Sequence, residues 1–302
     1  MIQISDSQIA ELGISPRKCV EWVTEAFKLK NECQLPAKVS VHPDQNDFIT
    51  TMPCLLPPGY HTFGVKVVSR VNGRHPALRS NLMLYDTRNS ELKAIFDANW
   101  ITSMRTGAVA TVAIKTFRRS DARIYSFIGL GETAHATMKC LLSECADEHL
   151  CVRLFRYKDQ AERFAEDFRS FSNVTFEIVD TIEELVVDTD VLVSCITDAK
   201  DLLVKDTSLL KPGILLVPVH TRGFQNCDTF FDKVFADDTA HVQGFKYFNE
   251  FKKFGEIGNV LTSVIQGRES ADERILSYNI GLGLHDVLFA ARILGIFRDK
   301  IL

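Results

Sequence analysis

The chain has 302 residues, of which 46% are hydrophobic and 25% charged, and its formal net charge is −4. This length suits one large or two medium domains, and the composition is that of an ordinary globular protein. A slightly negative chain gives no electrostatic reason to expect nucleic acid or an anionic membrane as a partner. No apolar run reaches the roughly 18 residues of a membrane span, and the opening residues, MIQISDSQIAELG, lack the basic and apolar regions of a signal peptide. We therefore expect a cytoplasmic protein.

The eight cysteines indicate neither a metal site nor a disulfide framework. None of them forms a CxxC pair, and several lie inside apolar runs. A domain of this size without a secretion signal does not need disulfides. We expect free thiols in a reducing compartment and no metal.

The first 118 residues or so mix helices and strands. Ser15, as an N-cap ahead of Pro16, predicts a helix that runs to about Lys28. Short apolar runs predict strands over residues 47–52, 63–70, 80–85 and 92–97, and the polar stretch DTRNSE predicts a hairpin loop between the last two. A longer helix is expected from near Thr102 to residue 117.

From Asp121 onward, apolar strands alternate with helical segments. The runs ARIYSFIG, VRLFRY, VTFEIV, DVLVSCI, GILLVPV and KVFADD predict strands, with helices between several of them. Thr181 and Glu184 have the spacing of a capping box at one helix start. Alternation with nearly continuous apolar strands is typical of a parallel α/β sheet. The final stretch, YNIGLGLHDVLFAARILGIF, is predicted to be a helix that packs back on the first domain, which makes that domain discontinuous.

A glycine turn follows the first of these strands. In IYSFIGLGETAHA, Gly129-x-Gly131-x-x-Ala134 ends a strand and opens a helix, which is the context of a dinucleotide-binding turn. Glycines let the backbone approach a pyrophosphate, and the helix N-terminus offers it N–H groups. The alternative is a simple strand-to-helix turn. With the alternating elements around it, the turn predicts a Rossmann-type domain in which Glu132 and Thr133, Cys195 near the end of DVLVSCI and Thr197 just after it also line the cofactor.

The next strand, VRLFRYKD, bears on the choice of cofactor. An NAD-binding strand usually ends in an acid that binds the ribose 2′-hydroxyl. Here Arg156 ends it, Lys158 is close by, and the nearest acid is Asp159. Cations at this place suit a 2′-phosphate, so NADP(H) is favoured over NAD(H). The alternative is that Arg156 and Lys158 are solvated side chains at the start of a helix.

Several blocks of the sequence resemble the ornithine cyclodeaminase/mu-crystallin family. They are FGVKVVS, NLMLYDTRNSELKAIFDANWITSMRTGAVATVAIKTF, FIGLGETA, GEIGNVL and GRESADERILSYNIGLGLHDV, and they follow the family's order over nearly the whole chain. The resemblance implies a homodimer of two-domain subunits. Residues 1–118 and 273–302 would form a discontinuous α+β domain for dimerisation and substrate binding, and residues 119–272 the Rossmann NAD(P)-binding domain, with the active site in the cleft between them.

The resemblance also assigns roles to residues of the first domain. Lys66 in GVKVVS matches the family lysine near the substrate carboxylate and the reacting carbon, and Arg105 in MRTGA matches the arginine that grips that carboxylate. Thr106 is expected to approach the cofactor phosphates, and the Met52-Pro53 pair to shape the cleft. The alternatives are an ordinary strand lysine and a helix-surface arginine, but a lone ammonium among Val65, Val67 and Val68 calls for a reason.

Two positions depart from the family pattern. Many members read PPR where this chain has LPAK, so Lys38 stands in for a substrate-binding arginine and keeps the charge without the bidentate fork. Aligned from Lys211-Pro212-Gly213, Arg222 falls where members carry an aspartate that faces the substrate. A cation there does not suit the second amine of ornithine, so we expect Arg222 to bind a second negative group.

Two histidines have more than one interpretation. His220 follows the GILLVPV strand, at the edge of the sheet where α/β sites lie, and is either a general acid or base or a loop histidine with hydrogen-bonded nitrogens. The tail pair His285-Asp286 is interpreted as structural. Three functions stay open: an NAD(P)-dependent dehydrogenase or imine reductase acting on a small amino acid, keto acid or imine; an ornithine cyclodeaminase that recycles its NAD; and a nucleotide-binding protein without turnover.

Overall fold

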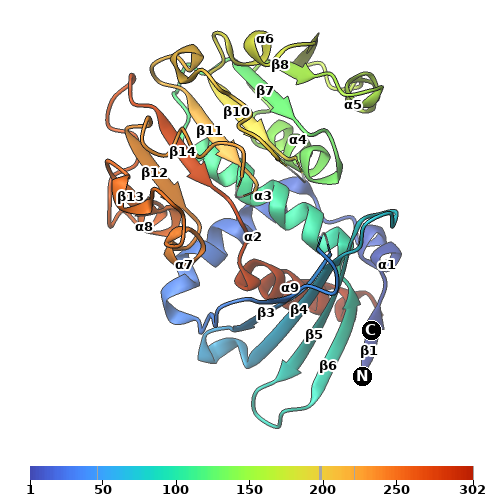
Figure 1. Cartoon of the computed structure of the whole chain (residues 1–302). Coiled ribbons are helices and arrows are strands. Elements are labelled where there is room, and N and C mark those ends of the chain that lie inside the picture. Colours follow the sequence, from blue (N-terminus) through green and yellow to red (C-terminus); the bar gives the residue numbers. More distant parts are fainter. Residues whose placement is uncertain (46, 197–198, 221, 302) are drawn as a thin grey trace. The chain divides into compact units, whose positions relative to one another are not determined.

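The computed structural model describes residues 1–45, 47–196, 199–220 and 222–301 of the chain. These residues divide into two compact units, one formed by residues 1–105 and 281–302 and the other by residues 106–280 (Figure 1). The first unit is therefore discontinuous. The division falls inside a long helix and just after a strand, whereas the sequence analysis placed it after residue 118 and before residue 273.

Unit 1 (residues 1–105 and 281–302) is built on a six-stranded sheet in the order β1-β6-β5-β4-β3-β2. The pairs from β2 to β6 are antiparallel and β1 pairs parallel with β6. The strands are β1 (Ile2–Ile4), β2 (Val39–Val41), β3 (Phe48–Leu55), β4 (Thr62–Arg70), β5 (Leu78–Asp86) and β6 (Leu92–Asp97). The four strands expected from the apolar runs are confirmed as β3 to β6, and β5 and β6 form the predicted hairpin.

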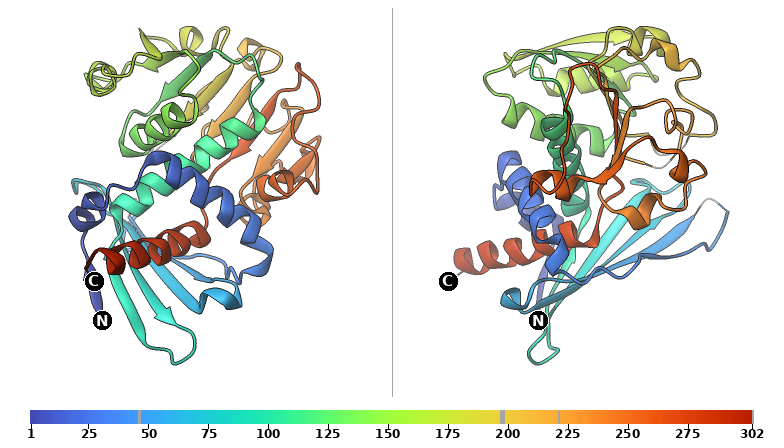
Figure 2. Two further views of the ribbon diagram at one scale, coloured as in Figure 1. Left: turned by 180° about the vertical axis from the view of Figure 1, so that it is seen from behind. Right: turned by 90° about the vertical axis from the view of Figure 1, so that its left-hand side faces the viewer.

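Helices cover one face of this sheet. They are α1 (Asp6–Glu11), α2 (Pro16–Leu29), the first part of α3 (Asn99–Phe117) and α9 (Gly283–Ile301), with 3-10 turns η1 (Lys30–Glu32) and η2 (Pro58–Tyr60). Helix α9 lies across β3, β4 and β5, and α2 packs on α9 (Figure 2). Between α2 and α9, the Trp22 and Phe289 rings pack edge to face, with 5.1 Å between their centres. Ser15 caps α2 and Pro16 opens it, as the sequence predicts.

Helix α3 begins earlier than the sequence indicated. We expected its start near Thr102, but it begins at Asn99 because Asp6 caps it from a distant part of the chain. Asp6 accepts hydrogen bonds from the Trp100 backbone N–H at 2.9 Å and from the Asn99 side chain at 2.7 Å. A carboxylate at a helix N-terminus satisfies the unpaired N–H groups and the helix dipole.

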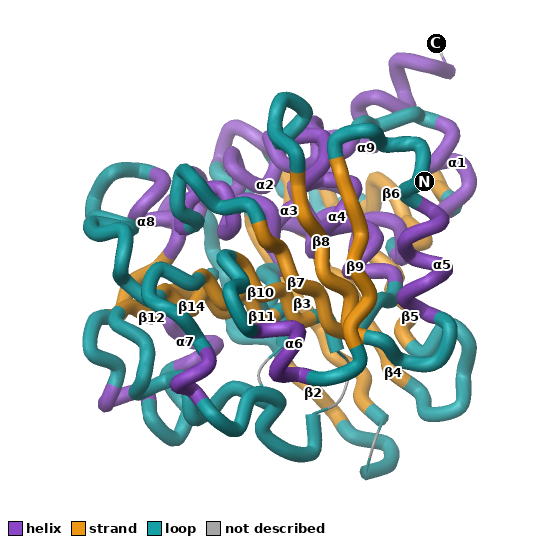
Figure 3. Tube along the Cα trace, turned by 90° about the horizontal axis from the view of Figure 1, so that it is seen from above, coloured by secondary structure: helices purple, strands orange, loops and turns teal. Residues whose placement is uncertain are grey.

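Unit 2 (residues 106–280) contains an eight-stranded sheet in the order β13-β12-β14-β11-β10-β7-β8-β9, whose strand pairs are all parallel (Figure 3). The order 3-2-1-4-5 from β9 to β11 is that of a Rossmann-type sheet. The predicted α/β class is confirmed, since unit 2 has a parallel Rossmann-type sheet and unit 1 has a mixed sheet. The strands are β7 (Ile124–Ile128), β8 (Leu150–Phe155), β9 (Val174–Val179), β10 (Val191–Ser194), β11 (Leu215–Pro218), β12 (Lys233–Ala236), β13 (Phe254–Glu256) and β14 (Ile275–Tyr278).

The helices of unit 2 are mostly short crossovers. They are the remainder of α3, α4 (Glu132–Glu144), α5 (Gln160–Asp167), α6 (Ile182–Val186), α7 (Thr239–Val242) and α8 (Ile257–Leu261), with turns η3 (Thr207–Leu209) and η4 (Phe248–Glu250). The capping box of Thr181 and Glu184 at the start of α6 is confirmed.

One strand was assigned wrongly from the sequence. Tyr278 was placed in the final helix, but it ends β14, a fully buried strand between β11 and β12. The helix begins only at Gly283, after a turn in which Gly281 has a φ of +91°. A run of four residues that are all buried cannot be told from a buried helix by its periodicity, because buried and exposed positions do not alternate in it.

Candidate functional site

Lys66 lies in the middle of the unit 1 sheet, on the face that α9 covers. Its cross-strand neighbours are Met52 on β3 and Leu82 on β5, and all three side chains are buried. Because side chains alternate along a strand, the valines on either side of Lys66 point to the opposite face. The ammonium is therefore enclosed under α9, and a buried charge of this kind needs partners.

The partner of Lys66 is Asp286, which also holds Arg105. Lys66 Nζ lies 2.8 Å from Asp286 Oδ2, and Arg105 Nε donates to Asp286 Oδ1 at 2.9 Å. The three side chains come from β4, α3 and α9, all within unit 1, and each is at most 6% exposed. Two cations against one carboxylate leave this triad (Lys66, Arg105 and Asp286) with one positive charge in excess when all three are ionised.

Glycines bring α9 close enough to the sheet to form the triad. A Cβ at Gly64, two residues before Lys66, would lie 2.7 Å from Val287 on α9, next to Asp286. A Cβ at Gly283 would lie 3.0 Å from the carbonyl oxygen of Met52. Side chains at these two positions would therefore push α9 away from β3 and β4. This close approach gives the Met52-Pro53 pair a packing role.

Gly281 packs against the guanidinium of Arg105. A Cβ at this position would lie 1.9 Å from Arg105 Nη1, so the guanidinium occupies the space that any side chain at residue 281 would need. Its φ of +91° also favours glycine. Residue 281 is thus fixed as glycine both by its backbone and by the arginine beside it.

The surroundings of Lys66 lower the pKa of its amine to near neutral pH. Burial, with Arg105 next in effect, lowers the pKa of Lys66 to about 7, against the opposing pull of Asp286. Lys38, in the exposed stretch before β2, lowers it further. Burial alone would raise the pKa of Asp286, but Arg105 and Lys66 together hold it below its ordinary value. An amine with a pKa near 7 can both release and accept a proton at neutral pH.

The glycine turn of unit 2 has the geometry that a dinucleotide requires. Gly129 follows β7 with a φ of +82°, and a Cβ on it would lie 2.5 Å from the backbone nitrogen of Ile196. Gly131 is the N-cap of α4 and has nothing within 4 Å of its Cβ position. Gly129 therefore serves the fold, whereas Gly131 leaves open space in front of a helix N-terminus. That space fits a pyrophosphate, which a side chain at residue 131 would displace.

Four of the other predicted cofactor residues adjoin this turn. Glu132 and Thr133 are in the first turn of α4, and Ala134 is buried beneath it. Cys195 follows β10, its N–H donates to the carbonyl of Ile128 at 2.8 Å, and burial raises the pKa of its thiol to about 12. Thr106 lies half-buried in α3. Thr197 is outside the described residues.

Arg156 and Lys158 follow β8, but neither is a bare cation. Arg156 forms ion pairs with Glu162 and Asp180, each at 2.9 Å. Lys158 lies over the exposed Tyr157 ring, 5.4 Å from its centre. The acids that the sequence did not show beside Arg156 come from α5 and from the end of β9. The carboxyl end of β8 therefore carries charges of both signs.

His220, two residues beyond β11, is held inside the unit. Its Nε2 lies 2.6 Å from Oγ of the fully buried Ser194. Burial lowers its pKa to about 4, opposed by a hydrogen bond with the backbone of Arg222. The imidazole is therefore neutral at pH 7 with its nitrogens engaged, and this geometry favours the structural interpretation of His220 over an acid–base role.

Arg222 and Asp228 lie in the same loop with opposite surroundings. The side chain of Arg222 is exposed. Asp228 is buried and accepts a hydrogen bond from the Tyr278 hydroxyl at 2.6 Å, and burial raises its pKa to about 6. Asp228 is therefore held by Tyr278, and Arg222 is the group of this pair that a ligand can reach.

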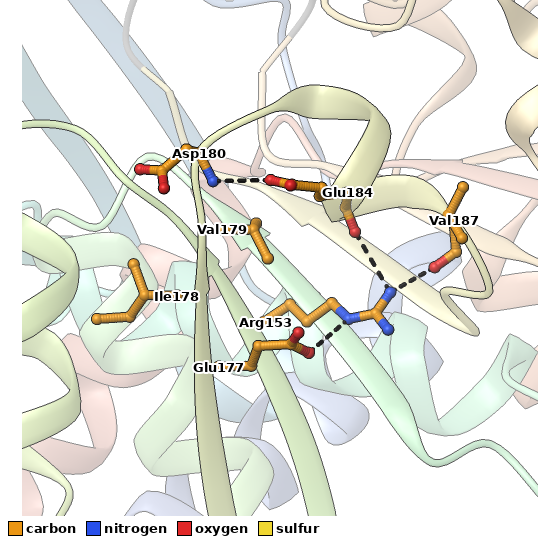
Figure 4. A pocket seen from close by; sticks show the side chains of 7 residues that line it. All are labelled: Arg153, Glu177, Ile178, Val179, Asp180, Glu184 and Val187. Atoms are coloured by element: carbon orange, nitrogen blue, oxygen red, sulfur yellow. Dashed lines mark hydrogen bonds and ion pairs between the residues drawn. The ribbon is translucent and has the colours of Figure 1, made fainter.

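A hollow of about 330 Å³ in unit 2 lies at the carboxyl end of β9 (Figure 4). Arg153 reaches across it, donating to Glu177 at 2.9 Å and to the carbonyls of Glu184 and Val187. Its guanidinium is thus engaged in anchoring α6 to β8 and β9. We interpret the hollow as a structural feature of the sheet edge.

Asp286 and Gly281 are the site residues that sequence reasoning missed. The pair His285-Asp286 was interpreted as structural, and Gly281 was not singled out. The signal for Asp286 was present, because an acid inside the apolar helix GLGLHDVLFAARIL calls for a buried partner as much as Lys66 does. The signal for Gly281 was absent, since only the folded structure shows Arg105 against it.

The described part of the chain lacks two features. No helix there is both long and apolar enough to span a bilayer. Among the same residues, no group of three or more His, Cys, Asp or Glu side chains is placed to hold a metal ion.

Comparison with known proteins identifies the family. The family model for the ornithine cyclodeaminase/mu-crystallin family matches residues 4–300. Nodulation efficiency protein NfeD of Rhizobium meliloti is 27% identical over 275 residues, which is 86% of this chain and 83% of that protein. Thermococcus litoralis Δ1-pyrroline-2-carboxylate reductase, solved with NADH and L-proline, superposes with a TM-score of 0.88 at 21% identity and covers 100% of this chain and 99% of its own. An archaeal alanine dehydrogenase dimer with bound NAD gives 0.86 at 22%, covering 100% and 97%.

The structural likenesses, at these identities, show the fold. The family model spans nearly the whole chain and includes the lysine, the arginine, the glycine turn and the helix that carries Asp286. The chain belongs to the ornithine cyclodeaminase/mu-crystallin family.

Proposed function

We propose that this chain is an NAD(P)-dependent oxidoreductase that acts by hydride transfer at the α-carbon of a small amino acid, keto acid or imine. The observation that carries the proposal is the buried triad of Lys66, Asp286 and Arg105, which has one positive charge in excess when Lys66 is protonated. A buried site with surplus positive charge attracts an anion, and the carboxylate of an amino or keto acid supplies one.

The chain's own residues divide the work of such a reaction. Arg105 binds the substrate carboxylate, for which a guanidinium offers parallel donors. Lys66, with a pKa of about 7, holds or transfers a proton at the nitrogen or oxygen on the α-carbon. Lys38 adds positive charge from the exposed stretch before β2. A nicotinamide dinucleotide whose pyrophosphate binds at the glycine turn would supply or accept the hydride.

Two relatives support this reaction class. The Thermococcus litoralis protein is a reductase solved with NADH and L-proline, and the archaeal protein is an alanine dehydrogenase solved with NAD. Both act on small α-amino or α-imino acids, which carry the carboxylate that the triad suits. We extend this reaction class to the chain, and the assay described below would identify its substrate.

The cofactor preference remains a prediction. Arg156 and Lys158 favour the 2′-phosphate of NADP(H), while Glu162 and Asp180, which already pair with Arg156, compete with that phosphate. The two relatives were solved with NADH and NAD. Paired titrations with NADPH and NADH decide between the two cofactors.

A homodimer is also part of the proposal. The sheet face opposite α9 carries a row of half-buried apolar side chains, Pro53, Val65, Met83 and Ile95, which face one another across four strands. At one edge, Val39 is 61% and Val41 is 56% exposed. Apolar surface of this kind is typical of an interface. Light scattering after size exclusion should give twice the 34.0 kDa of one chain.

The test of function is a cofactor-coupled assay. NADPH or NADH oxidation is followed with keto acids plus ammonia, with cyclic imines, and with dicarboxylic keto acids that would engage Arg222. We expect net oxidation with at least one of these substrates. Formation of proline and ammonia from ornithine without net change in NADH would instead indicate the cyclodeaminase reaction. Tight cofactor binding with neither activity would indicate a nucleotide-binding protein.

A further inference from the structure

Asp286 divides its two oxygens between two cations from different elements. One oxygen takes Lys66 from β4 and the other takes Arg105 from α3. If Asp286 served only to neutralise the buried Lys66, it would not need to bind Arg105 as well. Because the two oxygens of one carboxylate keep a fixed short separation, this arrangement also fixes the distance between the amine and the guanidinium.

The orientation of Arg105 is constrained at both of its ends. Its Nε donates to Asp286, and its Nη1 lies against Gly281, where a Cβ would be 1.9 Å away. The Nε edge of the guanidinium is therefore occupied by Asp286, and a substrate carboxylate is directed to the Nη groups. Asp286 thus sets which part of Arg105 faces a ligand.

We propose that Asp286 is a positioning residue that holds Lys66 and Arg105 at a fixed separation and favours the protonated form of Lys66. This inference rests on the proposed function, because it assigns Asp286 a task within the same substrate site. It differs from a purely structural ion pair, which would stabilise the fold but whose loss would leave the pH profile of kcat/KM in place.

The ionisable groups around Lys66 come from every element packed against it. Asp286 and His285 are on α9, Arg105 is on α3, Lys38 precedes β2, and Cys54 is on β3. Asp286 is the anion among them whose attraction raises the pKa of Lys66, while Arg105 and Lys38 lower it. Removing Asp286 and displacing Arg105 therefore have opposite effects on Lys66.

The first test is Asp286→Asn, which keeps the shape of the side chain and removes its charge. We expect kcat/KM to fall by about 100-fold, since the two cations lose their spacing. We also expect the apparent pKa in the pH profile of kcat/KM to move downward from about 7. The matched control is Asp86→Asn, another buried unit 1 carboxylate, which pairs with Arg88 and Lys93 and should leave the pH profile in place.

The second test is Gly281→Ala, which keeps all three ionisable groups. The added methyl displaces the guanidinium, so Lys66 loses its repulsion and the apparent pKa should move upward. The control is Gly73→Ala, which has a similar φ of +76° but open space around its Cβ position. This variant carries the test alone if Asp286→Asn does not fold. An unmoved pH profile in the folded variants would overturn the proposal.

A third measurement does not depend on activity. The free energy of unfolding is measured against pH for the wild type and both variants. Lys66 binds a proton in the unfolded chain but not in the folded chain between pH 7 and 10.5, so it makes stability rise with pH in that window. The rise should begin at lower pH in Asp286→Asn and at higher pH in Gly281→Ala. If no substrate turns over but these shifts appear, the proposed function is wrong, yet the effect of Asp286 on the protonation of Lys66 stands. If the pH at which stability begins to rise is the same in all three proteins, Asp286 does not control the protonation of Lys66.

Discussion

The candidate sites of the two units are built from opposite kinds of residue, charged side chains in unit 1 and glycines in unit 2. Unit 1 buries a cluster of three charged side chains, Lys66, Arg105 and Asp286, and holds them with hydrogen bonds and ion pairs. Unit 2 instead leaves side chains out, with Gly129 against the loop after β10 and Gly131 in front of α4. A buried charge is tuned by its partners, whereas an open backbone is specific only through shape and N–H groups. Substitutions should therefore change chemistry in unit 1 and binding in unit 2.

The largest effect is expected from Lys66→Met, which keeps the length of the side chain and removes the amine. We expect kcat to fall by about 10²- to 10⁴-fold because the proton donor is lost. Cofactor affinity, measured by fluorescence titration, should stay within about twofold of wild type. Lys93→Met, a half-buried lysine of the same unit, serves as the control. A variant that keeps the wild-type rate would remove Lys66 from the mechanism.

Within the glycine turn, substitutions at Gly129 and Gly131 should have different effects. Gly129→Ala puts a Cβ 2.5 Å from the Ile196 nitrogen at a φ of +82°. Strain and overpacking together should lower the free energy of unfolding by about 2–5 kcal/mol. Gly131→Val has open space at its Cβ and should fold normally, yet weaken cofactor binding by about tenfold or more. Equal losses of stability in both variants would contradict this division of roles.

How far the sequence could predict these sites follows from how local each one is. The glycine turn lies within six consecutive residues, and its strand and helix adjoin it, so its place and shape could be predicted. The triad joins residues 66, 105 and 286, and the Arg105–Asp286 contact spans 181 positions. The family resemblance supplied the two cations but not their carboxylate, because no local pattern pairs such distant residues.

The same distinction holds for the fold. The strands β3 to β6 and the alternating elements of unit 2 have clear periodicity and were predicted. The start of α3 depends on Asp6, which caps it from 93 residues away, and was missed. Strand β14 is a central strand whose four residues are all buried, so it lacks the alternation that marks a strand. Long-range capping and complete burial are the two features that a local pattern cannot show.

The pH dependence of stability is a smaller effect that sharpens the contrast between the units. In the wild type, Lys66 should make the free energy of unfolding rise by up to about 1.4 kcal/mol per pH unit above pH 7, since one more proton is bound in the unfolded chain. This contribution should be absent from Lys66→Met, measured by urea unfolding at several pH values. A slope that survives the substitution would mean that Lys66 is not the group responsible.

The smallest effect is expected at Arg156, where unit 2 does use side-chain charge. Arg156→Ala should weaken NADPH by a few-fold and leave NADH nearly unchanged, because the guanidinium is about half exposed and already shared with Glu162 and Asp180. Arg163→Ala, which breaks the exposed pair of Arg163 with Asp159 nearby, is the matched control and should affect neither cofactor. Asp180→Asn should have the opposite effect and tighten NADPH, because it frees Arg156 for the 2′-phosphate. Equal changes for both cofactors in Arg156→Ala would refute the 2′-phosphate assignment and leave Asp180 as the acid that receives a ribose hydroxyl.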